Sequence, residues 1–182
     1  EPRFLEPYPS AILDKKHFPK VIKAVGRRLN EEGLATKIYM PDEVIYGGLQ
    51  EVKGYINHLR NDTEADSLND AIAVHGYAED GITAGLPDFS KWEELWDETN
   101  NGPNQHELWM TETAPTYKKW DDGMNMAIAM HGAFKYGNVS LWTYYGFSTF
   151  QTNGQLNGLY YAMKNYYKYI RPDKVRVGVT SK

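Results

Sequence analysis

Four short apolar runs, separated by longer stretches with helical spacing, constrain most strongly how this chain can fold. The candidate strands are Lys37–Met40, Ala71–His75, Glu107–Thr111 and Asn138–Trp142. Corresponding positions in them recur at intervals of roughly 30 to 40 residues, the length of a strand–helix–strand unit with generous loops. Parallel strands need long crossover connections of this kind, so the rhythm predicts a parallel sheet.

The stretches around these strands have the apolar spacing of helices. In the first, apolar residues from Phe18 to Leu29 share one helical face, and Gly33 stands where a helix-ending glycine belongs. Pro172 breaks the pattern near the end of the chain, and an alternating, strand-like run from Val175 to Val179 follows it. The other four predicted helices are Leu49–Leu59, Phe89–Trp96, Met124–Phe134 and Leu156–Ile170.

A helix followed by four strand–helix pairs fits either an open doubly wound sheet or half of a (β/α)8 barrel. A dinucleotide-binding sheet would carry a G-x-G-x-x-G turn after a strand, whereas Gly47-Gly48 and Gly154 are isolated here. This favours the barrel, an α/β fold whose functional residues gather at the C-terminal strand ends. Those ends carry polar and aromatic residues here: Met40–Glu43, His75–Tyr77, Thr111–Thr113 and Trp142–Tyr145.

Composition narrows the possible functions. The net charge is −4, and Lys and Arg form no basic run, so we expect no nucleic acid partner. The chain has no cysteine, no metal-ligand spacing of His and acidic residues and no nucleophile-elbow serine, so we expect no metal and no cofactor. No apolar run approaches the ~18 residues that span a bilayer. Aromatic residues make up 14% of the chain, and such rings serve either sugar stacking or protein contacts.

Glu112 is the sharpest candidate for chemistry. An apolar strand ends in this carboxylate between Thr111 and Thr113, which would hold it at the mouth of a cleft, although a structural carboxylate bonded to neighbouring amides has the same pattern. A retaining glycosidase needs a second carboxyl group about 5 to 5.5 Å from the first. Spacing alone leaves several candidates for that partner comparable: Glu1, Glu6, Asp42, Glu43 and Glu79.

The motifs at the strand ends resemble those of glycoside hydrolase family 30, a family of retaining (β/α)8 barrel hydrolases, and the resemblance extends from one end of the chain to the other. Five elements of the family have counterparts in this chain: the acid/base motif on strand 4, the end of strand 6, the nucleophile element of strand 7, the strand 8 tryptophan and the exit from the last helix. In order, these are Glu1-Pro2 with Tyr8-Pro9-Ser10, His75-Gly76-Tyr77, Trp109-Met110-Thr111-Glu112, Trp142 and Tyr166–Asp173. The first lacks the family's Asn, and Asp173 replaces a Gly.

The resemblance implies that the chain carries strands 5 to 8 and helices 4 to 8 of a TIM-type barrel. Residues 1–171 would form this C-terminal half, and residues 172–182 would begin a following β-sandwich or a tail. Half a barrel leaves two open sheet edges and an exposed apolar face. We therefore expect the same polypeptide or a partner chain to supply the missing N-terminal half.

The resemblance also implies roles for individual residues. Glu112 becomes the nucleophile and Glu1 the acid/base, and Tyr77 would donate its hydroxyl to Glu112. His75 would contact a sugar hydroxyl or pack at the rim, and Tyr8 would join it in binding substrate. Trp142 would lie under the reacting sugar or fill the core.

The implied activity is hydrolysis of a β-linked glycan by double displacement. The alternative is a non-catalytic carbohydrate-binding or scaffold half-barrel. Asp42 and Glu43 could bind substrate hydroxyls, although acids in such positions are more often simply solvated. The family resemblance implies a secreted, periplasmic or cell-surface location.

Overall fold

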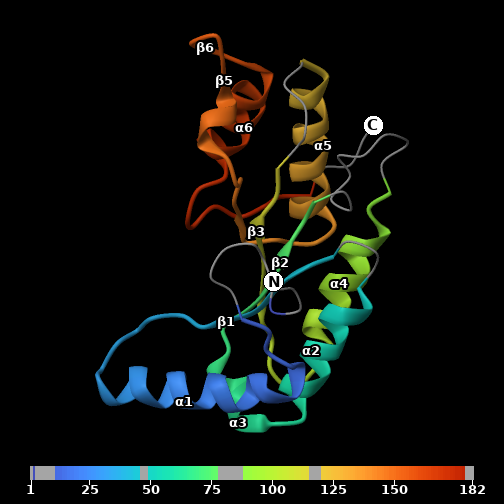
Figure 1. Ribbon diagram of the computed structural model, residues 1–182. Coiled ribbons are helices and arrows are strands. Elements are labelled where there is room, and N and C mark those ends of the chain that lie inside the picture. The colour runs from blue at the N-terminus through green and yellow to red at the C-terminus, as the bar shows by residue number, and fades with distance from the viewer. Residues whose placement is uncertain (1, 3–10, 46–48, 78–87, 115–119, 179–182) are drawn as a thin grey trace.

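A four-stranded parallel sheet forms the centre of the molecule (Figure 1). The computed structural model describes residues 2, 11–45, 49–77, 88–114 and 120–178. The strands pair in sequence order, so each connection crosses over the sheet, as the strand–helix rhythm predicts. They are β1 (Tyr39–Val44), β2 (Ala71–His75), β3 (Glu107–Glu112) and β4 (Leu141–Trp142).

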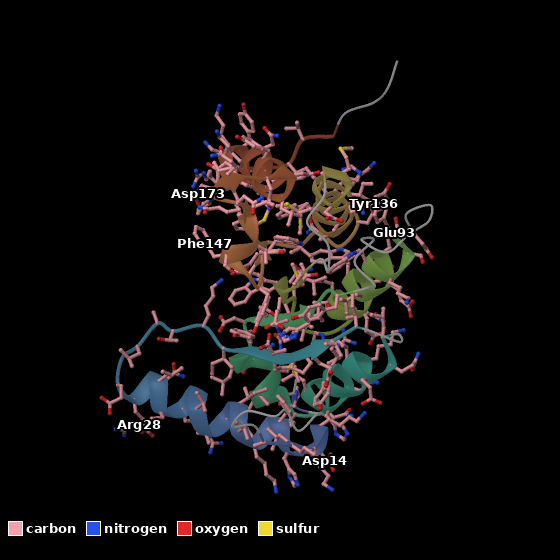
Figure 2. The ribbon with its side chains drawn as sticks, turned by 45° about the horizontal axis from the view of Figure 1, so that its top comes forward. Asp14, Arg28, Glu93, Tyr136, Phe147 and Asp173 are labelled. Carbon is pink, nitrogen blue, oxygen red and sulfur yellow. The ribbon has the colours of Figure 1, made fainter. Side chains whose placement is uncertain are left out.

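Helices follow the strands in the expected alternation. The α-helices are α1 (Phe18–Glu31), α2 (Gln50–Arg60), α3 (Thr63–Leu68), α4 (Ser90–Asn100), α5 (Trp120–Lys135) and α6 (Gly158–Tyr169). Two 3-10 turns, η1 (Lys15–His17) and η2 (Phe147–Phe150), and a small hairpin of β5 (Gln151–Thr152) and β6 (Gln155–Leu156) complete the described elements. In Figure 1, α1 and α3 lie at one end of the molecule, and α5 and α6 lie together at the other. Figure 2 shows Asp14 and Arg28 at the first end and Phe147 near the second.

Local signals explain where the helices begin and end. Gly33 adopts φ +67 just after α1, the left-handed conformation of a helix-ending glycine, as the sequence predicts. Asn157 caps α6 by accepting a hydrogen bond from the Tyr160 amide. The sequence analysis missed α3, because its six residues are too few to display an apolar period. Its signal is a cap, in which Asp62 accepts a hydrogen bond from the Ala65 amide.

The main core lies on the helix-covered face of the sheet. Ile72 and Val74 of β2 and Leu108 and Met110 of β3 are fully buried, in one cluster with side chains from the surrounding helices. Each such side chain contributes about 1.5 to 3 kcal/mol when it leaves water. This layer holds the strands in a fixed register beneath the helices.

The opposite face, which we call the open face, carries Tyr39, Glu107 and Trp109. The rings of Tyr39 and Trp109 lie 5.4 Å apart, and Tyr39 remains 44% exposed. Burial alone would raise the pKa of Glu107, but hydrogen bonds from Lys37, Trp109 and Ser140 outweigh it and lower the pKa to about 2. Large rings on a sheet face that stays partly exposed are a sign of a surface built for further packing.

A buried polar cluster fastens α3 to the amino ends of β2 and β3. The His106 ring places Nε2 at 2.8 Å from Asp66 Oδ1 and Nδ1 at 2.9 Å from the Asn69 carbonyl oxygen. Asn104 donates to the second oxygen of Asp66. Asp66 and His106 are almost fully buried, so their hydrogen bonds replace the water that both groups lose on folding.

Two strands differ from their predicted bounds by more than one residue, for identifiable reasons. The first was expected at Lys37–Met40 but is β1, which runs on through Pro41 to Val44 with an irregularity at Asp42. The last was expected from Asn138, yet β4 holds only Leu141 and Trp142. Asn138 adopts φ +47, a turn conformation that a strand cannot contain.

The tail leaves α6 at Ile170. The strand expected from Val175 is absent from residues 174–178, and Val175 is 86% exposed. Residue 179 and those after it lie outside the described residues. The domain boundary at residue 171 stays a prediction.

Candidate active site

The carboxyl ends of β1, β2 and β3 bring Asp42, His75 and Glu112 together. Parallel strands end at the same edge of a sheet, so residues far apart in sequence meet there. Beyond the strands the backbone stays anchored, because the His75 carbonyl oxygen accepts from the Ile45 amide at 3.1 Å and the Glu112 carbonyl oxygen accepts from the Gly76 amide at 2.8 Å. The site therefore stands on paired backbone.

A bulge in β3 turns Glu112 toward this site. Leu108 and Met110 face the core, so strict alternation would send Glu112 into the core as well. The register between β2 and β3 shifts there: Val74 pairs with Met110, His75 pairs with Glu112, and Thr111 is the extra residue. A one-residue shift reverses the face that a side chain takes, and Glu112 emerges 29% exposed beside His75.

A second bulge does the same for Asp42 in β1. Met40 faces the core, and alternation would place Asp42 there too. Asp42 is instead the extra residue between Pro41, which pairs with Ala73, and Glu43, which pairs with Val74. Its backbone adopts φ +61, a conformation that L side chains rarely take. The two bulges thus lie on either side of the end of β2.

Glu112 is engaged through one of its two oxygens. Tyr77 donates its hydroxyl to Oε1, which confirms the hydrogen bond expected from the sequence. His75 Nδ1 lies 3.8 Å from the same oxygen. Among the described residues, both contacts fall on Oε1.

Asp42 is held ionised beside the nucleophile candidate. The Thr111 hydroxyl lies 2.6 Å from Asp42 Oδ1, and His75 Nε2 lies 3.4 Å from the same oxygen. Burial alone would raise the pKa of Asp42, but the hydrogen bonds from His75 and Thr111 outweigh it and hold the pKa below its ordinary value. A general acid needs a raised pKa, so Asp42 does not fit the role of the second catalytic carboxyl group.

The other predicted site residues fall into two groups. Glu1 and Tyr8 lie outside the described residues, as do Glu6 and Glu79. Trp142 pairs with Met110 and is 5% exposed within the main core, so it packs under the helices. This position matches the core-packing alternative given for Trp142, and its contact with the reacting sugar stays a prediction.

The described residues form neither a metal-ligand cluster nor a membrane-spanning helix. No three His, Cys, Asp or Glu residues among them are grouped as metal ligands. None of the helices described above combines the length and the apolar character needed to cross a bilayer.

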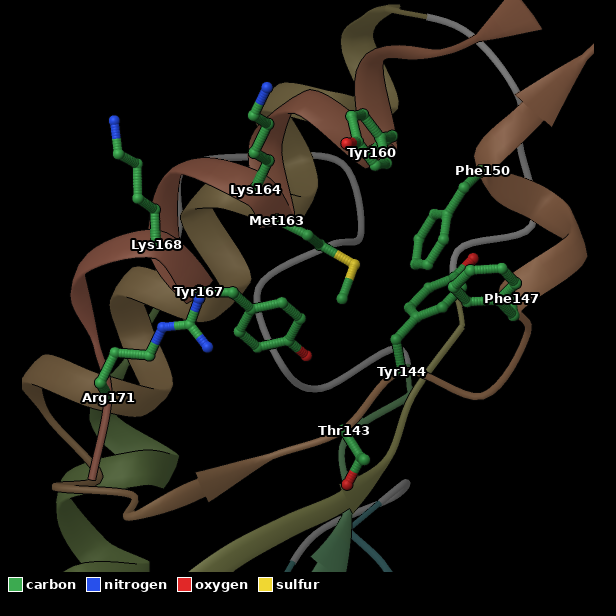
Figure 3. Close-up of a pocket in the computed structure, with 10 residues that line it drawn as sticks. All are labelled: Thr143, Tyr144, Phe147, Phe150, Tyr160, Met163, Lys164, Tyr167, Lys168 and Arg171. Carbon is green, nitrogen blue, oxygen red and sulfur yellow. The ribbon is translucent and has the colours of Figure 1, made fainter.

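A cavity of about 500 Å³ opens beside β4, between η2 and α6 (Figure 3). Tyr167 crosses its floor and donates its hydroxyl to the Trp142 carbonyl oxygen at 3.0 Å, and burial raises the pKa of Tyr167 to about 12. The walls are mainly aromatic, with three cations on the α6 side. The lining residues are Thr143, Tyr144, Phe147, Phe150, Tyr160, Met163, Lys164, Tyr167, Lys168 and Arg171.

Solved structures of glycoside hydrolases share this fold. A family 30 subfamily 8 xylanase from Clostridium acetobutylicum matches with a TM-score of 0.68 and 18% identity over 94% of this chain and 40% of its own. The catalytic domain of the family 30 xylanase C from Talaromyces cellulolyticus matches with a TM-score of 0.70 and 17% identity, over 95% and 40%. A conserved exported protein from Bacteroides fragilis matches with a TM-score of 0.66 and 12% identity, over 94% and 45%.

No family model and no curated protein matches the sequence. The chain spans about 40% of the length of the two xylanases. At these identities the likeness defines the fold, an α/β arrangement of parallel strands and helices shared with part of the family 30 catalytic domain. The resemblance inferred from the sequence is confirmed at that level.

Proposed function

We propose that this chain is the part of a family 30 barrel that carries strands 5 to 8 and helices 4 to 8, and that it serves a retaining β-glycoside hydrolase. The observation that carries the proposal is Glu112, turned by a bulge to the strand end and bound there by the Tyr77 hydroxyl. This carboxylate stands where barrel enzymes keep their catalytic groups. The fold shared with two xylanases supports the same assignment.

The proposed reaction is double displacement. Oε2 of Glu112 attacks the anomeric carbon, the bond to the leaving oxygen breaks, and the acid/base group protonates that oxygen. In the resulting ester, Oε1 becomes the carbonyl oxygen and keeps the hydrogen bond from Tyr77. The acid/base group then takes a proton from water, which attacks the same carbon and releases Glu112.

Glu1 is the acid/base residue in this proposal, by resemblance to the family motif. The requirement is a carboxyl group about 5 to 5.5 Å from that of Glu112. Asp42, the other carboxylate close to the site, is unsuited because its pKa is lowered.

A β-linked glycan is the proposed substrate class, with xylan first and β-glucan next. The two family 30 neighbours are named as xylanases, which sets that order. His75 and Tyr8 remain the proposed sugar contacts. Secretion or a cell-surface location goes with this activity, and one structural neighbour is named as an exported protein.

A barrel half supplied by the same polypeptide or by a partner chain is part of the proposal. The exposed ring of Tyr39 on the open face needs packing partners, and β1 and β4 are the two edges of the described sheet. We expect sedimentation velocity to detect self-association of the chain alone, and a monomer that stays soluble at high concentration would argue against a missing half.

Covalent labelling tests the catalytic assignment. A 2-fluoro-β-xyloside with an activated dinitrophenol leaving group needs the nucleophile but no proton donor, so it isolates the role of Glu112. We expect mass spectrometry to find one glycosyl adduct on the peptide that contains Glu112, and none in Glu112→Gln. Tyr77→Phe should label more slowly, because Oε1 loses its donor.

The alternative is a non-catalytic carbohydrate-binding half-barrel. It predicts a chain that binds xylo-oligosaccharides, measured by calorimetry, and stays unlabelled. A chain that is neither labelled nor able to bind these sugars when the missing barrel half is present would refute both functions.

A further inference from the structure

We propose that Asp42 is a positioning residue, which holds the imidazole of His75 and through it the environment of Glu112. The effect of Asp42 on the rate at which Glu112 reacts rests on the proposed function. The contact between Asp42 and His75 can be tested without any activity. Glu112 and Asp42 approach His75 from opposite neighbouring strands.

The backbone at Asp42 supports a dedicated role for its side chain. Glycine adopts φ +61 most readily, yet the chain places a carboxylate there. The conformation is accompanied by contacts that only this side chain makes: Oδ1 faces both the Thr111 hydroxyl and His75 Nε2. The carboxylate, and not the turn itself, explains the choice of residue.

The two bulged residues also bind each other. Asp42 is the extra residue of β1 and Thr111 that of β3, with β2 between them. The Thr111 hydroxyl, 3.1 Å from the Val74 carbonyl oxygen and 2.6 Å from Asp42 Oδ1, reaches across β2. The side chains thus close a bridge over the strand whose last residue is His75.

His75 is enclosed and flanked by carboxylates. Its side chain is 7% exposed, with Nε2 at 3.4 Å from Asp42 and Nδ1 at 3.8 Å from Glu112. The partner of one ring nitrogen fixes the tautomer and the orientation of the whole ring. A negative charge at Nε2 therefore favours a proton there, and the ring turns its Nδ1 edge to Glu112.

A direct role for Asp42 in sugar binding is the competing explanation. If Asp42 contacted the sugar directly, it would contribute to the affinity for the glycan. A positioning residue instead changes the rate at which bound glycan reacts. The two roles separate when binding and reaction are measured independently.

Three variants make the test. Asp42→Gly removes the carboxylate and suits the positive φ, so we expect it to fold. Thr111→Val keeps the shape of the side chain and removes the bridging hydroxyl. Thr143→Val is the matched control just after β4, since among the described residues the Thr143 hydroxyl donates to the Met110 carbonyl oxygen, at 3.3 Å.

Nitrogen-15 NMR of the histidine rings, with His75 assigned through His75→Gln, reports the tautomer directly. In the unmodified chain we expect His75 to carry a proton at Nε2. Asp42→Gly should shift the ring nitrogens toward a mixture of tautomers, Thr111→Val should shift them in the same direction by less, and Thr143→Val should leave them unchanged. Identical His75 spectra in the unmodified chain and in Asp42→Gly would overturn the proposal.

Labelling with the 2-fluoro-β-xyloside then measures the consequence. At saturating reagent we expect Asp42→Gly to react roughly 10- to 100-fold more slowly, as for a slightly misplaced catalytic group, with the dissociation constant of the reagent unchanged. A weaker dissociation constant at an unchanged rate would assign Asp42 to the sugar and overturn the proposal. If the unmodified chain is not labelled when the missing barrel half is present, the proposed function fails, and the NMR spectra still decide whether Asp42 holds His75.

Discussion

Replacement of Asp66 by Asn tests how far the buried polar cluster holds the amino ends of the sheet. Asp66 accepts from His106 and Asn104, and His106 also faces the Asn69 carbonyl oxygen. Both ring nitrogens of His106 therefore face oxygen atoms, one from the Asp66 carboxyl group and one from the Asn69 backbone. Asp66→Asn keeps the shape of the side chain but removes the charge. Its amide NH2 group would then face an N–H group of either His106 or Asn104.

The expected loss of stability follows from burial. A hydrogen bond to a charged group contributes about 1.5 to 3 kcal/mol, and breaking a buried pair costs about 3 to 5 kcal/mol. Because the amide oxygen can still accept one of the bonds, we expect Asp66→Asn to lower the free energy of unfolding by about 3 kcal/mol. For a chain of this length that corresponds to a fall in Tm of roughly 6 to 12 °C.

Urea unfolding followed by circular dichroism measures the change, with Glu64→Gln as the matched control. Glu64 lies in the same helix, α3, and pairs with Arg27, but this pair is exposed and water screens it. We expect the control to change stability far less than Asp66→Asn. If Asp66→Asn lowered the free energy of unfolding no more than Glu64→Gln, burial would not be the reason that this cluster stabilises the fold.

Two further predictions concern the open face and the helix contacts. The pKa of Glu107 is about 2 in the folded chain against an ordinary 4.5, so its contribution to stability is full above pH 4.5 and is lost as the pH falls toward 2. The side chain is 41% exposed and screened by solvent, so we expect Glu107→Gln to remove about 1 kcal/mol or less of this dependence in acid unfolding curves; an unchanged curve would contradict the lowered pKa. Gly123→Ala would bring a Cβ within 2.7 Å of the Gly158 carbonyl oxygen and should cost about 1 to 3 kcal/mol by thermal unfolding. Gly54→Ala, whose Cβ would meet only the flexible end of Lys15, should instead gain up to about 1 kcal/mol, and equal losses in both would contradict the steric explanation.

Regular elements could be predicted from the sequence because their periods are uninterrupted. Ala71–His75 is an unbroken apolar run, and β2 has the predicted bounds. Leu156–Ile170 repeats its apolar residues at helical spacing and contains α6, which Asn157 caps. Where one local rule governs a whole segment, the pattern determines the element.

The elements that could not be predicted depend on contacts between segments. The end of β1 follows the bulge at Asp42, whose partners Thr111 and His75 come from two other strands. Trp142 could face either side of its strand, and only the pairing with Met110 decides for the core. No period within one segment contains such information.

The candidate site, too, could be predicted from the sequence only in part. Motifs were sufficient to select Glu112, His75 and Tyr77, because each stands at or just after a strand end and its residue type suits the chemistry. The part that we propose for Asp42 was not visible, since a solvated acid and a positioning acid have the same sequence signature. The positive φ at Asp42 distinguishes the two.

The paired bulges have a consequence for comparing relatives of this chain. Loss of Asp42 or of Thr111 would restore an even ladder and leave the surrounding sheet intact. Glu112 would then follow Met110 directly and still face His75, and Glu43 would keep its place on the core face. What either loss removes is one end of the bridge between Asp42 and Thr111. In an alignment of such chains, a one-residue gap at either place would therefore mark a relative in which the ring of His75 is held differently.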